Sequence, residues 1–241
     1  EVGWADALGD LLQALKDATG DVKAATWAHA PNEEMGLLKA LLAQVGGGDV
    51  VFRSPRTEGE VLLPGFPLLA RREDLAPNVN GAEIFGFERV GNDDAKGGLD
   101  ELAGHTGVLI VVGDPLEDYG PDFGAQAELF VYLGSYTSEA AAKAHFVLPT
   151  TTFAEQEGSY TNIQGRVQRF WPAVRSPGSS RPGWLILGAL LAELTETEAP
   201  VSADQAFSRV AGEVAEFSGI TYGDMGTRGA EGKKSAGVAG D

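Results

Sequence analysis

The sequence predicts an α/β fold in which helices flank a mostly parallel β-sheet. Helical and strand-like segments alternate from the amino terminus onward, which is the pattern of a parallel sheet. Several of the strand-like segments are short, continuous apolar runs, typical of strands that are covered on both faces. Each of these runs ends in small and polar residues, as expected where open α/β sheets place their binding loops.

The first fifty residues establish this alternation. They contain, in order, a predicted helix over residues 4–16, a strand over 22–29, a helix over 35–45 and a strand over 49–52. The loop Pro31-Asn32-Glu33-Glu34 is expected to cap the second helix and to place two acids in its first turn.

Residues 53–98 interrupt the pattern with glycine, proline and charged residues. This stretch is longer than a simple connection between two elements in a compact domain. It is therefore either a structured excursion over the sheet or an insertion.

Regular segments return after this stretch. They are a short helix over 99–103, strands over 108–112, 129–133 and 146–148, and an alanine-rich helix over 139–144 that Thr137 is expected to cap. The three strands end in Gly113-Asp114-Pro115, in residues 134–137 and at Pro149. Because neighbouring parallel strands end on the same side, these three loops are expected to lie along one edge of the sheet.

The segment 144–168 is the first place to look for function. We interpret it as a strand that feeds a long structured loop. Asn162 and Arg166 flank Gly165, where an amide and a guanidinium could bind a planar or anionic group; alternatively, both satisfy backbone groups of the loop. Glu155 and Glu157 are either a general acid/base pair or loop ties.

The last part of the chain divides into three regions. An extended piece over 170–172 and an apolar helix over 184–194 complete an α/β domain over residues 1–194. Residues 195–226 contain an amphipathic helix capped by Ser202, which is expected to pack on that domain. Residues 227–241 are rich in glycine and alanine and are expected to form a flexible tail.

Composition narrows the function. The chain has 18 basic and 35 acidic residues and a formal net charge of −17, which argues against nucleic acid or an anionic membrane surface as a partner. It has no cysteine, so thiolate-bound zinc and iron–sulfur clusters are excluded within it, and its three histidines have no metal-ligand spacing. No apolar run approaches the roughly 20 residues of a membrane span, so direct membrane insertion is not expected. We identify no catalytic and no metal-binding residue. Because the chain starts at Glu1 and not at methionine, it is expected to be a piece of a longer protein.

The run V-L-P-T-T-T-F-A-E-Q-E-G-S-Y-T-N-I-Q-G-R-V-Q, residues 147–168, resembles the signature segment of the molybdopterin oxidoreductase superfamily, which includes formate dehydrogenases and nitrate reductases. Asn32-Glu33-Glu34, Gly113-Asp114-Pro115 and the helix that begins near Trp184 agree with it, so the resemblance covers residues 21–194. It implies a molybdopterin-oxidoreductase-like, Rossmann-like domain.

Within this superfamily, the chain looks most like the large iron–sulfur subunit of bacterial respiratory complex I, the NADH:quinone oxidoreductase. That resemblance implies a structural and assembly role without a redox centre or cofactor in this segment. Iron–sulfur clusters would lie in preceding amino-terminal domains, and the partners would be other peripheral-arm subunits at the cytoplasmic face of the inner membrane. Glu139 and His145 depart from the cofactor-binding members, and we expect the carboxyl-terminal β-barrel of those members to be absent as well.

Two alternatives remain open. The first is a fragment of a catalytic molybdopterin-dependent enzyme of the formate dehydrogenase or nitrate reductase type, which binds a guanine dinucleotide cofactor. In that case the resemblance implies the following cofactor-binding residues: Gly113, Asp114, Ser135, Thr151, Asn162 and Arg166. The second is a free-standing binding module for a nucleotide.

Overall fold

The computed structural model of the chain describes residues 2–54, 61–71, 74–90 and 99–233. The helices are α1 (Trp4–Asp17), α2 (Asn32–Gln44), α3 (Val79–Ile84), α4 (Asp100–Ala103), α5 (Gly183–Thr195), α6 (Ala203–Glu213) and α7 (Tyr222–Met225), with 3-10 turns at η1 (Ala141–Lys143) and η2 (Ala215–Phe217). The strands are β1 (Val22–Trp27), β2 (Val50–Arg53), β3 (Val61–Leu63), β4 (Phe66–Arg71), β5 (Glu88–Val90), β6 (Val108–Val112), β7 (Leu129–Gly134), β8 (Phe146–Pro149), β9 (Gly158–Thr161), β10 (Arg166–Phe170) and β11 (Ala230–Glu231). None of these helices is long and apolar enough to cross a membrane.

The centre of the fold is a six-stranded sheet with the order β5-β2-β1-β6-β7-β8. All five neighbouring pairs are parallel, which confirms the predicted fold class. The chain first builds outward from β1 through β2 to β5, then returns to place β6 on the other side of β1 and continues through β7 to β8. The direction of winding therefore reverses between β1 and β6, and this switch point is where doubly wound sheets bind ligands.

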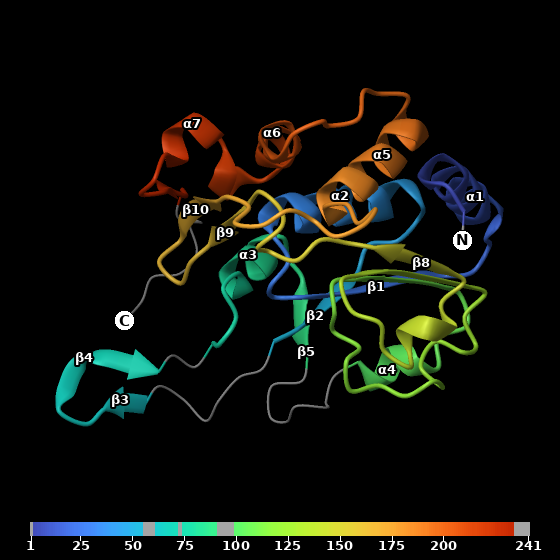
Figure 1. The fold of residues 1–241 in the computed structure, drawn as a ribbon, viewed down its shortest axis with the longest axis horizontal. Coiled ribbons are helices and arrows are strands. Elements are labelled where there is room, and N and C mark those ends of the chain that lie inside the picture. Colours follow the sequence, from blue (N-terminus) through green and yellow to red (C-terminus); the bar gives the residue numbers. More distant parts are fainter. Residues whose placement is uncertain (1, 55–60, 72–73, 91–98, 234–241) are drawn as a thin grey trace.

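Helices cover one face of the sheet, and a thinner layer covers the other (Figure 1). On the first face, α1, α2, α5 and α6 share one apolar core with strand residues such as Val108 and Ile110. On the second face, Leu109 and Val111 pack in a smaller core with α4 and with the loops on either side of β7. Burial on both faces explains why β6 is an uninterrupted apolar run in the sequence.

Residues 53–98 contain more regular structure than the sequence pattern predicts. β5 and α3 belong to the body of the fold, and β5 forms one edge of the central sheet. β3 and β4 pair as an antiparallel hairpin that stands apart from the body (Figure 1). The hairpin exposes a group of large apolar side chains, each at least half exposed: Val61, Leu62, Leu63, Phe66 and Leu69. The neighbouring residues 55–60, 72–73 and 91–98 lie outside the described part.

The region after β8 also differs from the prediction of a long loop. β9 and β10 form an antiparallel pair inside it, because Gly165 (φ +79°) allows the chain to turn back. β11 then pairs with β10, so ordered structure continues past the expected boundary at residue 227, while residues 234–241 lie outside the described part. The alanine-rich helix expected over 139–144 is only the 3-10 turn η1, and Ser138, not Thr137, accepts a hydrogen bond at its start.

Candidate functional site

A pocket of about 270 Å³ opens at the carboxyl ends of β1, β6, β7 and β8, where the winding of the sheet reverses. The loops after these strands and the start of α2 supply its walls. The residues that line the pocket include Trp27, His29, Glu34, Gly113, Asp114, Ser135, Tyr136, Thr151, Phe153 and Gln156. Four of the six residues that the sequence singled out therefore meet in this pocket: Gly113, Asp114, Ser135 and Thr151.

Asp114 is committed to bonds within the chain. Its Oδ1 accepts hydrogen bonds from the Tyr132 hydroxyl (2.7 Å), the Ser135 backbone N–H (2.9 Å) and the Tyr136 backbone N–H (3.0 Å). Its Oδ2 accepts one from the Ser135 hydroxyl (2.5 Å). A carboxylate that receives four donors is well satisfied, so its role in this arrangement is to fix the loop after β7.

Gly113 lies directly beneath the Trp27 indole. Its φ is +87°, a conformation that favours glycine, and a Cβ placed there would lie 2.1 Å from Trp27 Nε1. The Trp27 ring also packs against the His29 ring, with 4.8 Å between centroids, and burial lowers the pKa of His29 below its ordinary value. The space that glycine leaves open at the end of β6 is thus filled by the chain's own indole.

Glu34 contributes a buried carboxyl to the pocket wall. The residue is 5% exposed, and no described group donates a hydrogen bond to its side chain. Its Oε2 packs against Gly183 at the start of α5, where an added Cβ would lie 2.0 Å away. Burial, helped by the negative charges of Asp114 and Glu33, raises the pKa of Glu34 from 4.5 to about 8.

Two further buried polar atoms of the pocket lack a hydrogen-bond partner in the part of the chain that the structure describes. They are Thr151 Oγ1 and Gln156 Oε1, in residues that are 5% and 6% exposed. No lysine or arginine is among the residues that line the pocket. The pocket is therefore rich in hydrogen-bond acceptors and carries no cationic side chain.

Replacing Glu34 with glutamine is expected to flatten the pH dependence of the free energy of unfolding. The carboxyl keeps its proton in the folded chain up to about pH 8 but loses it in the unfolded chain above about pH 4.5. Stability from this group is therefore complete below pH 4.5 and falls as the pH rises toward 8, by about 1.4 kcal/mol per pH unit. Urea unfolding at several pH values measures this. The free energy of unfolding of Glu34→Gln, relative to that of the unchanged protein, should increase with pH at about this slope. For the exposed control Glu193→Gln, the difference from the unchanged protein should not change with pH. Parallel curves for Glu34→Gln would contradict the assignment.

A second polar cluster lies behind the pocket wall and is centred on Glu33. This fully buried carboxyl accepts hydrogen bonds from the Ser159 N–H (2.9 Å), the Ser159 hydroxyl (2.7 Å) and the Tyr222 hydroxyl (2.7 Å). Burial raises its pKa to about 7, and these donors oppose the rise. Because three donors stabilise its ionised form, Glu33 loses its proton at a lower pH than Glu34 does. The cluster ties α2, β9 and α7 together.

Sequence reasoning missed this cluster. The sequence predicts that the loop Pro31-Asn32-Glu33-Glu34 caps α2 with two acids in its first turn, and Pro31 is the N-cap with Glu33 and Glu34 in that turn. It does not predict that Asn32, Glu33 and Glu34 are buried. Acids in a first helical turn are so common at exposed helix starts that the local pattern carries no sign of burial. The partners of these residues, Ser159 and Thr161, lie more than a hundred positions later in the sequence. A pattern of neighbouring residues therefore could not indicate the contact.

The other predicted residues lie outside the pocket. Asn162 Oδ1 accepts the N–H groups of Gln164 (2.9 Å) and Arg166 (3.0 Å), which fixes the turn between β9 and β10. Arg166 bonds Glu231 (2.6 Å) and the Gly229 carbonyl (3.2 Å) in β11 and the turn before it. Glu155 accepts the Thr152 N–H (2.9 Å), and Glu157 pairs with Arg169, so both are loop ties. Among the described residues, no group of three histidine, aspartate or glutamate side chains could hold a metal ion.

Residues 118–193 match the family model of molybdopterin oxidoreductases. The alpha subunit of a formate dehydrogenase of Methanococcus maripaludis is 33% identical over 104 residues, which cover 42% of this chain and 15% of that subunit. NADH-quinone oxidoreductase subunit 3 of Thermus thermophilus is 28% identical over 187 residues, 71% of this chain and 24% of the subunit. A subunit of the NADH-quinone oxidoreductase of Rhizobium meliloti is 29% identical over 254 residues, 95% of this chain and 29% of the subunit. The chain is thus similar to subunits of both kinds of enzyme and spans less than a third of the length of each of these relatives.

Proposed function

We propose, for a chain that carries a molybdopterin oxidoreductase segment, that it is a structural and assembly part of the iron–sulfur subunit in the peripheral arm of an NADH:quinone oxidoreductase. In this proposal it positions iron–sulfur domains that precede it, binds other peripheral-arm subunits at the cytoplasmic face of the bacterial inner membrane, and holds no cofactor of its own. The two NADH-quinone oxidoreductase relatives, which align with 71% and 95% of the chain, support this assignment.

The proposal depends most on one observation: side chains of this protein occupy the loops where related enzymes would hold a cofactor. Dinucleotide sites need a backbone that a pyrophosphate can approach closely, and glycine at a strand end normally provides it. Here the Trp27 indole lies over Gly113, and both oxygens of Asp114 are bonded to the loop after β7. Both contacts favour a loop arrangement that is retained for packing.

Charge and size point the same way. A guanine dinucleotide carries a pyrophosphate, whereas this pocket offers the Asp114 carboxylate, the buried Glu34 carboxyl and no cationic side chain that could balance the phosphate charge. Its volume of about 270 Å³ is below the roughly 300–1,000 Å³ of sites for drug-sized ligands, and such a dinucleotide is larger than those ligands. The residues present therefore do not fit the cofactor that the family model implies, and we assign no chemical step to it.

The alternative is a fragment of a catalytic molybdopterin enzyme. The match over residues 118–193, which includes the loops after β7 and β8, favours it, and so does the similarity to a formate dehydrogenase subunit. Under this alternative Asp114 contacts the cofactor; under the proposal it only holds the loop.

Metal analysis of the full-length protein separates the two functions. We expect no stoichiometric molybdenum or tungsten, and no shift in melting temperature with millimolar GDP. A molybdenum-loaded formate dehydrogenase produced in the same host is the positive control for cofactor supply. Stoichiometric metal that disappears in Asp114→Asn would overturn the proposal, whereas a metal-free protein that Asp114→Asn only destabilises would support it.

A further inference from the structure

The pocket at the switch point presents acceptors that have no hydrogen-bond partner among the described residues. Thr151 Oγ1, just after β8, and Gln156 Oε1, in the loop beyond it, are buried without a hydrogen-bond partner. The Glu34 carboxyl, from α2, lies in the same pocket wall, and no described group donates a hydrogen bond to it. Each residue is more than nine-tenths buried. Since buried polar groups in folded proteins are nearly always hydrogen-bonded, this grouping indicates a ligand that brings donors.

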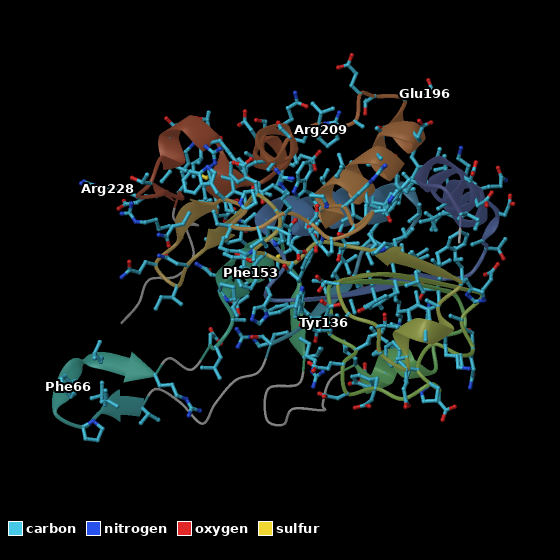
Figure 2. The ribbon with its side chains drawn as sticks, viewed as in Figure 1. Phe66, Tyr136, Phe153, Glu196, Arg209 and Arg228 are labelled. Atoms are coloured by element: carbon cyan, nitrogen blue, oxygen red, sulfur yellow. The ribbon has the colours of Figure 1, made fainter. Side chains whose placement is uncertain are left out.

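Aromatic side chains also line the pocket. Trp27 lies at its base over Gly113, while Tyr136 and Phe153 come from the loops after β7 and β8. These two residues are 70% and 65% exposed, so their rings are accessible to a ligand from solvent. Figure 2 labels both of them on the ribbon. Aromatic faces beside a carboxyl attract organic cations, because the ring face carries negative charge.

We propose that this pocket binds an alkylguanidinium group. A guanidinium has only donors, five of them in a planar fork, and matches a wall of acceptors that includes a carboxyl. It is more weakly hydrated than an ammonium and stacks on aromatic rings, so it suits a largely buried site with aromatic walls. The pocket is also the size of a side chain or fragment and not of a larger ligand. This site goes beyond the proposed structural role and does not depend on it.

Binding of the guanidinium is expected to be coupled to loss of the proton on the Glu34 carboxyl. The charged or titratable groups around Glu34 are Asp114, Glu33, His29 and Tyr160, and none of them supplies a positive charge because burial favours neutral His29. A bound cation would stabilise the ionised Glu34 carboxyl and release its proton. Affinity should therefore increase with pH up to about 8 and level off above it.

Isothermal titration of the full-length protein with N-ethylguanidinium chloride tests the site. We expect saturable binding at one site, a shift of the Trp27 indole N–H resonance, and proton release detected as a dependence of the heat on buffer ionisation. Glu34→Gln should weaken binding at least about tenfold, the loss expected for a charge-assisted hydrogen bond. Because Phe153 is exposed, Phe153→Ser should weaken binding severalfold without affecting folding. Ile163 is also more than half exposed but lies outside the pocket, so Ile163→Ser should bind as the unchanged protein does.

Two further ligands distinguish a guanidinium on a partner protein from one on a free metabolite. N-acetyl-arginine methylamide represents an arginine within a partner chain, whereas free arginine adds a carboxylate that Glu34 and Asp114 would repel. Tighter binding of the first supports a partner's side chain, and tighter binding of the second supports a free metabolite. No saturable heat with N-ethylguanidinium, equal affinity in Glu34→Gln, equal affinity for ethylammonium, or tighter binding of GMP would each overturn the proposal. Tight GMP binding would also count against the proposed function, whereas the other three outcomes leave that function intact.

Discussion

Replacing Gly113 with alanine is expected to lower the free energy of unfolding by about 3 kcal/mol, because two costs combine at this position. The first is backbone strain, since φ is +87° and a residue with a Cβ rarely adopts that value. The second is the collision of the new methyl group with the Trp27 indole, 2.1 Å from its Nε1. Urea unfolding followed by circular dichroism measures the combined loss.

Two further variants separate these costs. Gly46 has nearly the same conformation, φ +82°, but nothing lies within 4 Å of an added Cβ, so Gly46→Ala should show the strain alone, about 1 kcal/mol. In the double variant Trp27→Ala/Gly113→Ala the collision is absent, and the cost of the second substitution should fall to that of Gly46→Ala. If Gly113→Ala costs no more than Gly46→Ala in the unchanged background, the indole does not hold the position assigned to it.

The second large effect is expected at Glu33. Glu33→Ala removes the acceptor for three buried hydrogen bonds, from the Ser159 N–H, the Ser159 hydroxyl and the Tyr222 hydroxyl. Donors left unsatisfied in the interior cost about 1–3 kcal/mol each, part of which is offset because a desolvated carboxyl is also removed. The net loss is expected to be about 3 kcal/mol in urea unfolding. Since Tyr222 belongs to α7, limited proteolysis should also cut the segment after α6 earlier in the variant.

Controls for Glu33 come from the same hydrogen bonds and from an exposed helix start. Tyr222→Phe removes one of the three bonds and should cost about 1 kcal/mol, and its effect should vanish when Glu33 is already alanine. Asp204 lies in the first turn of α6 without burial, so Asp204→Ala should change stability by less than about 1 kcal/mol. Additive effects of Tyr222→Phe and Glu33→Ala would show that the two side chains do not interact.

The sheet could be predicted because its physical causes are local. The five residues of β6 are all apolar and all buried, and the predicted and observed bounds agree because Gly113 ends the strand in both. The small and polar residues from Gly134 onward and the proline at Pro149 likewise predicted where β7 and β8 end, and so predicted that the loops after them lie at one edge of the sheet. The hairpin of β9 and β10 was missed, because its strands are short and polar and the turn at Gly165 resembles an ordinary loop.

The candidate site was predictable only where it coincides with strand ends. Gly113, Asp114, Ser135 and Thr151 were found in this way, since the carboxyl ends of neighbouring parallel strands must converge. Trp27, Glu34 and Gln156 were not, because their roles depend on contacts between segments far apart in the sequence. Asn162 and Arg166 carried the right chemistry for a ligand but face β10, β11 and their own turn. Residue type indicates what a side chain can bind, whereas only the tertiary fold decides which groups it meets.

The order of strands in the central sheet also constrains how this chain folds. Val22 of β1 pairs with Val108 of β6, so the middle of the sheet cannot close until the chain has been made at least as far as β6. Bringing two such distant strands together loses conformational entropy before the contacts between them can stabilise the structure. Topologies dominated by distant contacts therefore fold slowly. During synthesis, β1, β2 and β5 therefore emerge with one edge of β1 open to pairing with other chains. Rapid completion of β6 is what protects the nascent protein from association along that edge.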